Sequence, residues 1–194
     1  MAHHKVNKNF YKPSLMQKNS EKRCPDIKVS NSSLLNIVDK QPHNQIRIYT
    51  DASYSIQTDI GVTSFIVTQN NEQIYSQSYS LNQGKGSTFS ELVAINRALD
   101  YVYDQIKPKN VVELYTDSKM SVNIIDGKVK LKQSKKDYWK LVNSIRKREN
   151  ARVLYVPAHT DGKGLHTKYN VQADKLCKEH LRSIVSEYNN FANK

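Results

Sequence analysis

Residues 46–81, IRIYTDASYSIQTDIGVTSFIVTQNNEQIYSQSYSL, decide the fold class of this chain. They contain three runs rich in β-branched and aromatic residues: IRIYTDASY, IGVTSFIVTQ and QIYSQSYSL. The last two runs are separated by the turn-forming pair Asn70 and Asn71. Such runs, joined by short turns, pair in antiparallel order. This stretch therefore predicts a three-stranded antiparallel meander.

Helices and two further strands follow the meander. From Ser87, apolar residues recur at three- and four-residue spacing, which predicts a helix that ends before Pro108. VVELYT and RVLYV are expected strands, and helices are expected at 118–126, at 137–149 and from about residue 171. The last of these should bury Leu176, Leu181, Ile184 and Tyr188. Helices that link strands imply parallel pairing, so we expect an α/β fold with a five-stranded mixed sheet flanked by helices.

Four acidic residues stand where such a sheet would bring them together. Asp51 lies in the first strand and Asp117 ends the fourth, while Glu91 lies in the first turn of the first helix and Asp174 opens the last helix. Ligand sites in open α/β sheets lie beyond the carboxyl ends of the parallel strands, which favours a site beside Asp51 and Asp117.

Each acidic residue also has an ordinary structural interpretation. Thr88 to Glu91 fits a capping box, Asp117 precedes a helix, Asp51 could close a turn, and Asp174 could pair with a lysine one helical turn later. A short motif taken alone does not separate these readings.

The order of four motifs does separate them. IYTDASYS, STFSELVAINRAL, LYTDSKMSV and VPAHT with YNVQADKL occur in the order of the ribonuclease H family signature. From about residue 46 to about residue 186 the chain resembles that family, and its short segment before the last strand is similar to that of retroviral ribonuclease H domains. The resemblance implies the ribonuclease H-like fold.

The resemblance also implies which residues act. It assigns the metal ligands to Asp51, Glu91, Asp117 and Asp174, and a mobile catalytic histidine to His159, with His166 as the alternative. It implies two Mg²⁺ ions, for which Mn²⁺ could substitute. Asp51 would bridge them, Asp117 would hold the ion that activates water, and Glu91 and Asp174 would complete the leaving-group side. Without metal, the clustered carboxylates should raise one another's pKa values.

The implied reaction is endonucleolytic cleavage of the RNA strand of an RNA–DNA hybrid, giving 3′-hydroxyl and 5′-phosphate ends. Little sequence preference is expected, because phosphate contacts position a duplex without reading its bases. The substrate-binding residues expected from these motifs and from the Lys-rich loop 127–136 are Ser53, Lys85, Ser87, Thr88, Ser118, Lys132 and Asn170. Ser87 and Thr88 are shorter than the Asn or Gln that the family often carries near this helix, which weakens the expected reading of ribose hydroxyls.

Composition agrees with a nucleic-acid partner. The 194 residues include 30 Lys and Arg against 18 Asp and Glu, a net charge of +12, which favours polyanions and nucleic acid above all. Residues 1–45 carry eight basic and three acidic residues, so we expect a basic, poorly ordered extension before a catalytic domain at 46–190. There is no apolar run of membrane-spanning length and no secretory signal, so an intracellular, cytoplasmic protein is expected. Cys24 and Cys177 are expected to be incidental thiols.

Two other functions remain open at this level. A junction resolvase or another DNA nuclease on the same fold would retain several acidic residues and cut DNA. A non-catalytic hybrid-binding module would rely on charge alone. The sequence also leaves open whether the chain acts alone or within a larger replication or reverse-transcription assembly.

Overall fold

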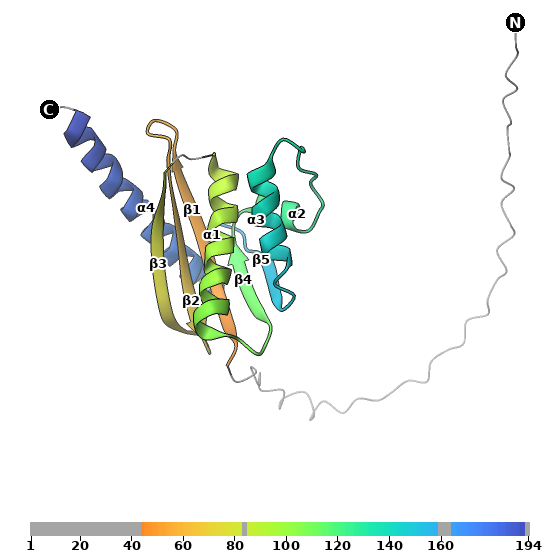
Figure 1. Cartoon of the computed structure of the whole chain (residues 1–194). Coiled ribbons are helices and arrows are strands. Elements are labelled where there is room, and N and C mark those ends of the chain that lie inside the picture. Colours follow the sequence, from red (N-terminus) through yellow and green to blue (C-terminus); the bar gives the residue numbers. More distant parts are fainter. Residues whose placement is uncertain (1–43, 83–84, 159–163, 193–194) are drawn as a thin grey trace, which may run out of the picture. The chain divides into compact units, whose positions relative to one another are not determined.

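The computed structural model describes residues 44–82, 85–158 and 164–192 (Figure 1). Its strands are β1 (Ile46–Ser55), β2 (Ile60–Gln69), β3 (Glu72–Asn82), β4 (Val112–Thr116) and β5 (Ala151–Tyr155). Its helices are α1 (Ser87–Tyr101), which continues as the π-helical turn η1 (Val102–Ile106), α2 (Lys119–Ile125), α3 (Lys136–Arg146) and α4 (Leu165–Ala192).

The five strands form one mixed sheet in the order β3-β2-β1-β4-β5. β1, β2 and β3 pair antiparallel, and the two-residue turn between β2 and β3 places Asn70 and Asn71 at positive φ. β4 pairs parallel with β1 and with β5. The predicted meander and the predicted mixed sheet are therefore confirmed.

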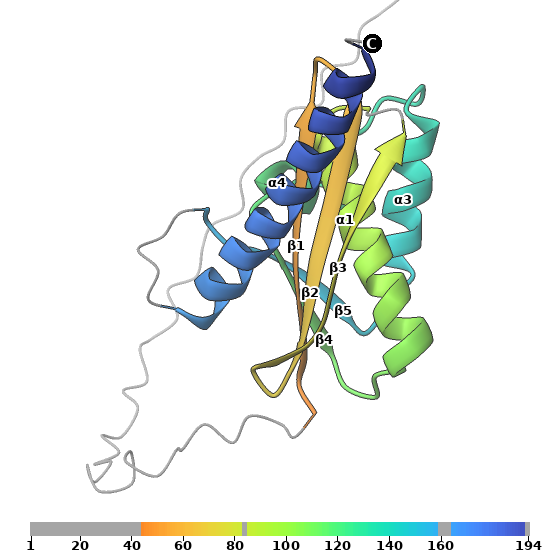
Figure 2. The same cartoon turned by 90° about the vertical axis from the view of Figure 1, so that its left-hand side faces the viewer.

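Helices cover both faces of this sheet, with α1 and α3 on one side and α4 on the other (Figure 2). Strand alternation supplies each face with its own core. Ile48 and Phe65 pack toward Leu92, Leu99 and Val142 on the α1 side. The core on the α4 side is built from Tyr49, Ile66, Tyr115, Tyr169 and Ala173.

The last helix differs from its prediction in start and in buried face. It begins at Leu165, six residues before the expected start, so Asp174 lies in its third turn. Its fully buried stripe runs through Tyr169, Ala173 and Cys177, whereas the expected core residues are half-buried or, in the case of Tyr188, 55% exposed. The small side chains of Ala173 and Cys177 allow α4 to lie close to the sheet. The buried face predicted from the sequence was instead the one that carries the large aliphatic residues.

Over the described residues, no helix combines the length and the apolar character needed to cross a membrane. Cys177 is a fully buried thiol that donates to the carbonyl of Val62 at 3.0 Å, and Cys24 lies outside the described residues. Cys177 is thus part of the contact between α4 and the sheet.

Candidate metal centre

The parallel pairing of β1 and β4 brings the first two acidic residues together. Thr50 pairs with Thr116, and the next residue along each strand direction is Asp51 or Asp117. Asp51 itself pairs with Ser64 inside the antiparallel ladder, so it does not close a turn. Two carboxylates thus stand side by side where β4 and its parallel pairing with β1 end, as the sequence predicted.

Helix α1 supplies the third carboxylate through close packing on β2. A Cβ at Gly61 would lie 2.8 Å from the hydroxyl of Ser90, so α1 can approach the strand only because that position has no side chain. Ser90 is fully buried, and the adjacent Glu91 is only 8% exposed. The approach at Gly61 therefore carries Glu91 into the interior beside β1.

The capping-box interpretation of Glu91 does not hold. The N-cap of α1 is Gly86, no side chain caps the helix, and Glu91 is the fifth residue of the helix and not part of its first turn. The cap of α2 is Ser118, whose hydroxyl accepts from the backbone N–H of Ser121 at 3.4 Å. Helix capping therefore does not explain the presence of Glu91 or Asp117.

Asp51, Glu91 and Asp117 form a compact group of oxygen ligands. One carboxylate oxygen of each lies within 4.8 Å of the other two. Oδ2 of Asp51 and Oε2 of Glu91 are buried and make no hydrogen bond among the described residues. Buried carboxylate oxygens without partners are costly unless a cation satisfies them. The group therefore fits a hard divalent cation such as Mg²⁺, which prefers oxygen ligands.

The electrostatics of the group agree with that fit. Burial, followed by the charges of Asp117 and Asp174, raises the pKa of Asp51 to about 7. Burial and the charges of Asp51 and Asp117 raise the pKa of Glu91 well above its usual value. The backbone N–H of Ala52 partly opposes both shifts. The predicted mutual repulsion is thus confirmed for Asp51 and Glu91, although desolvation is the larger cause.

Asp174 approaches the group from α4. The hydroxyl of Ser64, the strand partner of Asp51, donates to the carbonyl of Ala173 at 2.7 Å and fixes the helix beside β1. Asp174 is close enough to raise the pKa of Asp51, and its carboxylate forms an ion pair with Lys178 at 2.8 Å. The ion pair of Asp174 with a lysine one turn later, which the sequence suggested, is therefore present, and Asp174 also raises the pKa of Asp51.

The two candidate histidines are in different situations. His166 lies at the start of α4, where its ring packs 4.1 Å from that of Tyr115 and its Nδ1 lies 3.1 Å from the hydroxyl of Tyr49. It lies eight positions before Asp174, about 12 Å away along the helix axis. Burial and then the charge of Arg47 lower the pKa of His166. His166 is thus part of an aromatic cluster, and His159 lies outside the described residues.

The predicted substrate-binding residues lie on several different elements of the fold. Ser53 is half-buried in β1, Ser87 and Thr88 form the first turn of α1, and Lys132 is exposed in the loop before α3. Lys85 forms an ion pair with Asp137.

Ser118 and Asn170 have structural surroundings of their own. The hydroxyl of Ser118 lies 2.8 Å from that of Ser121 at the start of α2. Asn170 lies one helical turn before Asp174 and is 6% exposed, and its Oδ1 has no hydrogen-bond partner within the described part of the chain.

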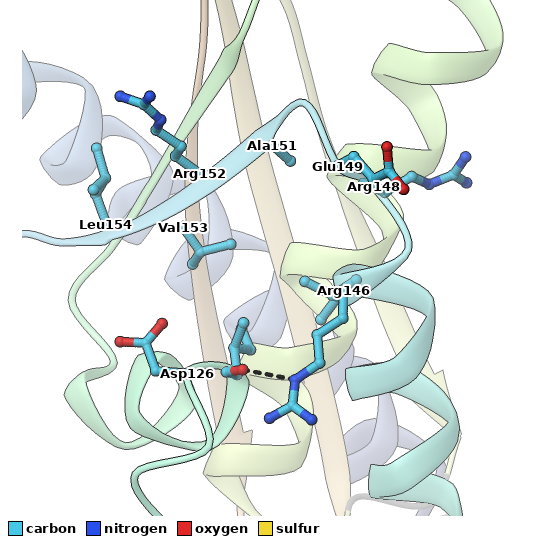
Figure 3. A pocket seen from close by; sticks show the side chains of 10 residues that line it. Asp126, Arg146, Arg148, Glu149, Ala151, Arg152, Val153 and Leu154 are labelled. Atoms are coloured by element: carbon cyan, nitrogen blue, oxygen red, sulfur yellow. Dashed lines mark hydrogen bonds between the residues drawn. The ribbon is translucent and has the colours of Figure 1, made fainter.

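A separate cavity of about 460 Å³ opens between α2, α3 and β5 (Figure 3). The guanidinium of Arg146 there donates to the carbonyls of Ile125 and Ile124, at 2.7 and 3.0 Å, and so closes the end of α2. None of the four acidic candidates lines this cavity. It is therefore distinct from the carboxylate group.

Two residues that shape the site, Gly61 and Ser64, carried no clear signal in the sequence, whereas the pairing of Lys178 with Asp174 was expected from their four-residue spacing. Gly61 permits the approach of α1, Ser64 holds α4, and Lys178 reaches both Asp174 and the field of Asp51. A glycine inside a strand pattern hints at close backbone approach, which was the one available sign. The contact of Ser64 with α4 joins residues 109 positions apart in the sequence, which local patterns do not report.

Comparison with known proteins identifies relatives of this architecture. The model of the RNase H family matches residues 43–182. The chain is similar to LC11-RNase H1, isolated from compost by a metagenomic approach, at 21% identity and a TM-score of 0.58 over 73% of this chain and 99% of that one. It is similar to RNase H1 of the halophilic archaeon Halobacterium salinarum at 15% identity and 0.58, over 72% and 98%.

LC11-RNase H1 has also been solved in complex with an RNA/DNA hybrid, and that structure is 23% identical with a TM-score of 0.55, over 70% of this chain and 95% of that one. At these identities the solved structures establish a common fold. No curated protein sequence is a significant match.

Proposed function

The chain belongs to the RNase H family, and on that premise we propose that it is an endoribonuclease that cuts the RNA strand of RNA–DNA hybrids. The observation that supports this most is the group formed by Asp51, Glu91 and Asp117, whose oxygens lie within 4.8 Å of one another with two of them buried and unpartnered. Three separate elements supply these carboxylates at high electrostatic cost, which is typical of a functional site.

In this proposal the four acidic residues hold two Mg²⁺ ions, or Mn²⁺ in their place. Asp51 would contribute to both ions, Asp117 to the ion on the attacking side, and Glu91 and Asp174 to the ion on the leaving-group side. Bound ions of this kind activate water and stabilise the leaving oxyanion, which gives 3′-hydroxyl and 5′-phosphate ends. The N–H of Ala52 stabilises the ionised forms of Asp51 and Glu91, the forms that can bind a cation.

Residues around the group would hold the duplex. We assign contacts with the RNA strand to Ser53, Ser87 and Thr88, near the carboxylates on β1 and α1, and phosphate contacts to exposed Lys132 and to Lys85, which must leave its ion pair with Asp137. Ser118 and Asn170 complete the proposed binding set, and His159 would assist proton transfer or product release. The catalytic domain would span 46–190, with 1–45 as a basic extension.

A panel of labelled substrates tests the proposal. RNA–DNA hybrid, double-stranded RNA, double-stranded DNA and branched DNA are incubated with Mg²⁺, Mn²⁺ or chelator. We expect metal-dependent cleavage of the RNA strand of the hybrid alone. Cleavage of branched DNA in its place would identify a resolvase, and a shift of the hybrid without cleavage in either metal would identify a binding module.

A further inference from the structure

Lys178 places a positive charge beside Asp174, at the carboxylate site. It follows Asp174 by one turn of α4, and its ammonium lies 2.8 Å from the carboxylate oxygens of Asp174. The influence extends further, because the charge of Lys178 lowers the pKa of Asp51 and the charge of Asp51 raises that of Lys178. The ammonium therefore stands where a divalent cation held by Asp174 would act.

A second ion pair on the same helix shows what an ordinary pair looks like. Lys175 and Glu179 have the same four-residue spacing, but they are 3.7 Å apart and their side chains are 74% and 57% exposed. The side chains of Lys178 and Asp174 are 48% and 32% exposed. Exposed pairs of this spacing contribute only about 0.3–0.5 kcal/mol to stability, so the pair of Lys178 with Asp174 adds little to the stability of the helix.

The position of Asp174 agrees with competition for its carboxylate. Among the described residues, the oxygens that lie within 4.8 Å of one another come from Asp51, Glu91 and Asp117, and Asp174 is outside that set. Both of its oxygens face the ammonium of Lys178. For Asp174 to serve as a metal ligand, at least one oxygen must exchange Lys178 for the ion.

We propose that Lys178 is a positioning residue that occupies the carboxylate of Asp174 in the metal-free protein and competes with the divalent ion that binds there. This inference rests on the proposed metal-dependent function. Lys178 acts as an internal counterion that offsets the repulsion between Asp174 and Asp51, and it sets the metal concentration at which Asp174 changes partner. Its removal should therefore strengthen metal binding.

The test is calorimetric titration of the full chain with Mn²⁺ and without nucleic acid. Lys178→Gln should reduce the half-saturating Mn²⁺ concentration roughly fivefold. That factor corresponds to about 1 kcal/mol, the attraction of two unit charges about 4 Å apart in water-like surroundings, which the ion must otherwise overcome to separate Asp174 from Lys178. Lys178→Arg retains the charge and should behave as the wild type. Lys175→Gln removes the same charge from the same helix without touching Asp174, and should change the affinity less than twofold.

An Asp174→Asn background separates competition from a general field effect. There, Lys178→Gln should change Mn²⁺ affinity by twofold at most, because the contested carboxylate is gone. Equal affinities in Lys178→Gln and Lys175→Gln, a persistent fivefold gain in the Asp174→Asn background, or no Mn²⁺ binding by any variant would each overturn the inference. Mn²⁺ binding as expected without hybrid cleavage would contradict only the proposed function.

Discussion

Replacing Asp51 by Asn should stabilise the metal-free protein at pH 8 and have little effect of this kind at pH 4. Burial and neighbouring carboxylates raise the pKa of Asp51 from 3.8 to about 7, and the residue is only 6% exposed. Folding therefore favours its protonated form. The stability that this form contributes at low pH is lost as the pH rises through the window from 3.8 to about 7.

The size of the loss follows from the pKa difference. At about 1.4 kcal/mol for each pH unit, a rise from 3.8 to about 7 corresponds to about 4 kcal/mol. Asn is neutral throughout, so the free energy of unfolding of Asp51→Asn, relative to the wild type, should grow by about 2–4 kcal/mol between pH 4 and pH 8. Any pH-independent cost of the amide cancels in this comparison.

Urea unfolding followed by circular dichroism, in chelator at pH 4, 6 and 8, measures this difference. Asp104→Asn, an exposed carboxylate on η1, is the control and should show no comparable growth with pH. Saturating Mg²⁺ should reduce the advantage of Asp51→Asn at pH 8, because a bound cation stabilises the ionised wild type. A difference that stays flat across pH would refute the electrostatic reasoning.

Three further outcomes are expected. At pH 8, replacing chelator by Mg²⁺ should raise the thermal unfolding midpoint of the wild type far more than that of Asp117→Asn. Equal shifts in the two proteins would show that Asp117 is not a metal ligand. In urea titrations Gly61→Ala should cost about 1–3 kcal/mol, because its Cβ would lie 2.8 Å from the hydroxyl of Ser90; a cost that does not fall in a Ser90→Ala background would contradict this contact. His166→Ala should lower the free energy of unfolding by about 1–3 kcal/mol through lost ring packing and leave cleavage by the folded protein intact. His159→Ala should slow cleavage without changing the unfolding curve. The reverse pattern would exchange the roles of the two histidines.

The strands and most helices could be predicted because their signals are local. Alternation and the Asn70–Asn71 turn determine the meander, and the three- and four-residue spacing from Ser87 determines α1. The start of α4 could not be predicted in this way. Its first turns are held by Tyr169, whose tilted ring packs against that of Tyr49 of β1 with the ring centroids 5.1 Å apart, a contact between residues 120 positions apart.

The candidate site was likewise predictable where it depends on local sequence signals and unpredictable where it depends on packing. The proximity of Asp51 and Asp117 follows from the parallel pairing of β1 with β4, which the alternation of helices and strands already implied. The burial of Glu91 depends on how closely α1 approaches Gly61, and the proximity of Asp174 to Asp51 depends on where α4 crosses the sheet. These are properties of packing, which single-sequence periodicity does not report.

Cleavage of an end-labelled RNA–DNA hybrid in Mg²⁺ by the wild type and by Asp117→Asn tests the central claim most directly. Asp126→Asn serves as the matched control, because Asp126 lies at the end of α2 and pairs with Lys128 at 2.7 Å, away from the carboxylate group. We predict that the wild type and Asp126→Asn cut the RNA strand and leave 5′-phosphate ends. Asp117→Asn should cut more slowly by about 100-fold or more, because loss of a residue that only supports a metal ligand already costs about 10–100-fold. Equal cleavage by Asp117→Asn, or cleavage of the DNA strand, would contradict the assignment of this carboxylate group as the catalytic centre of a ribonuclease H.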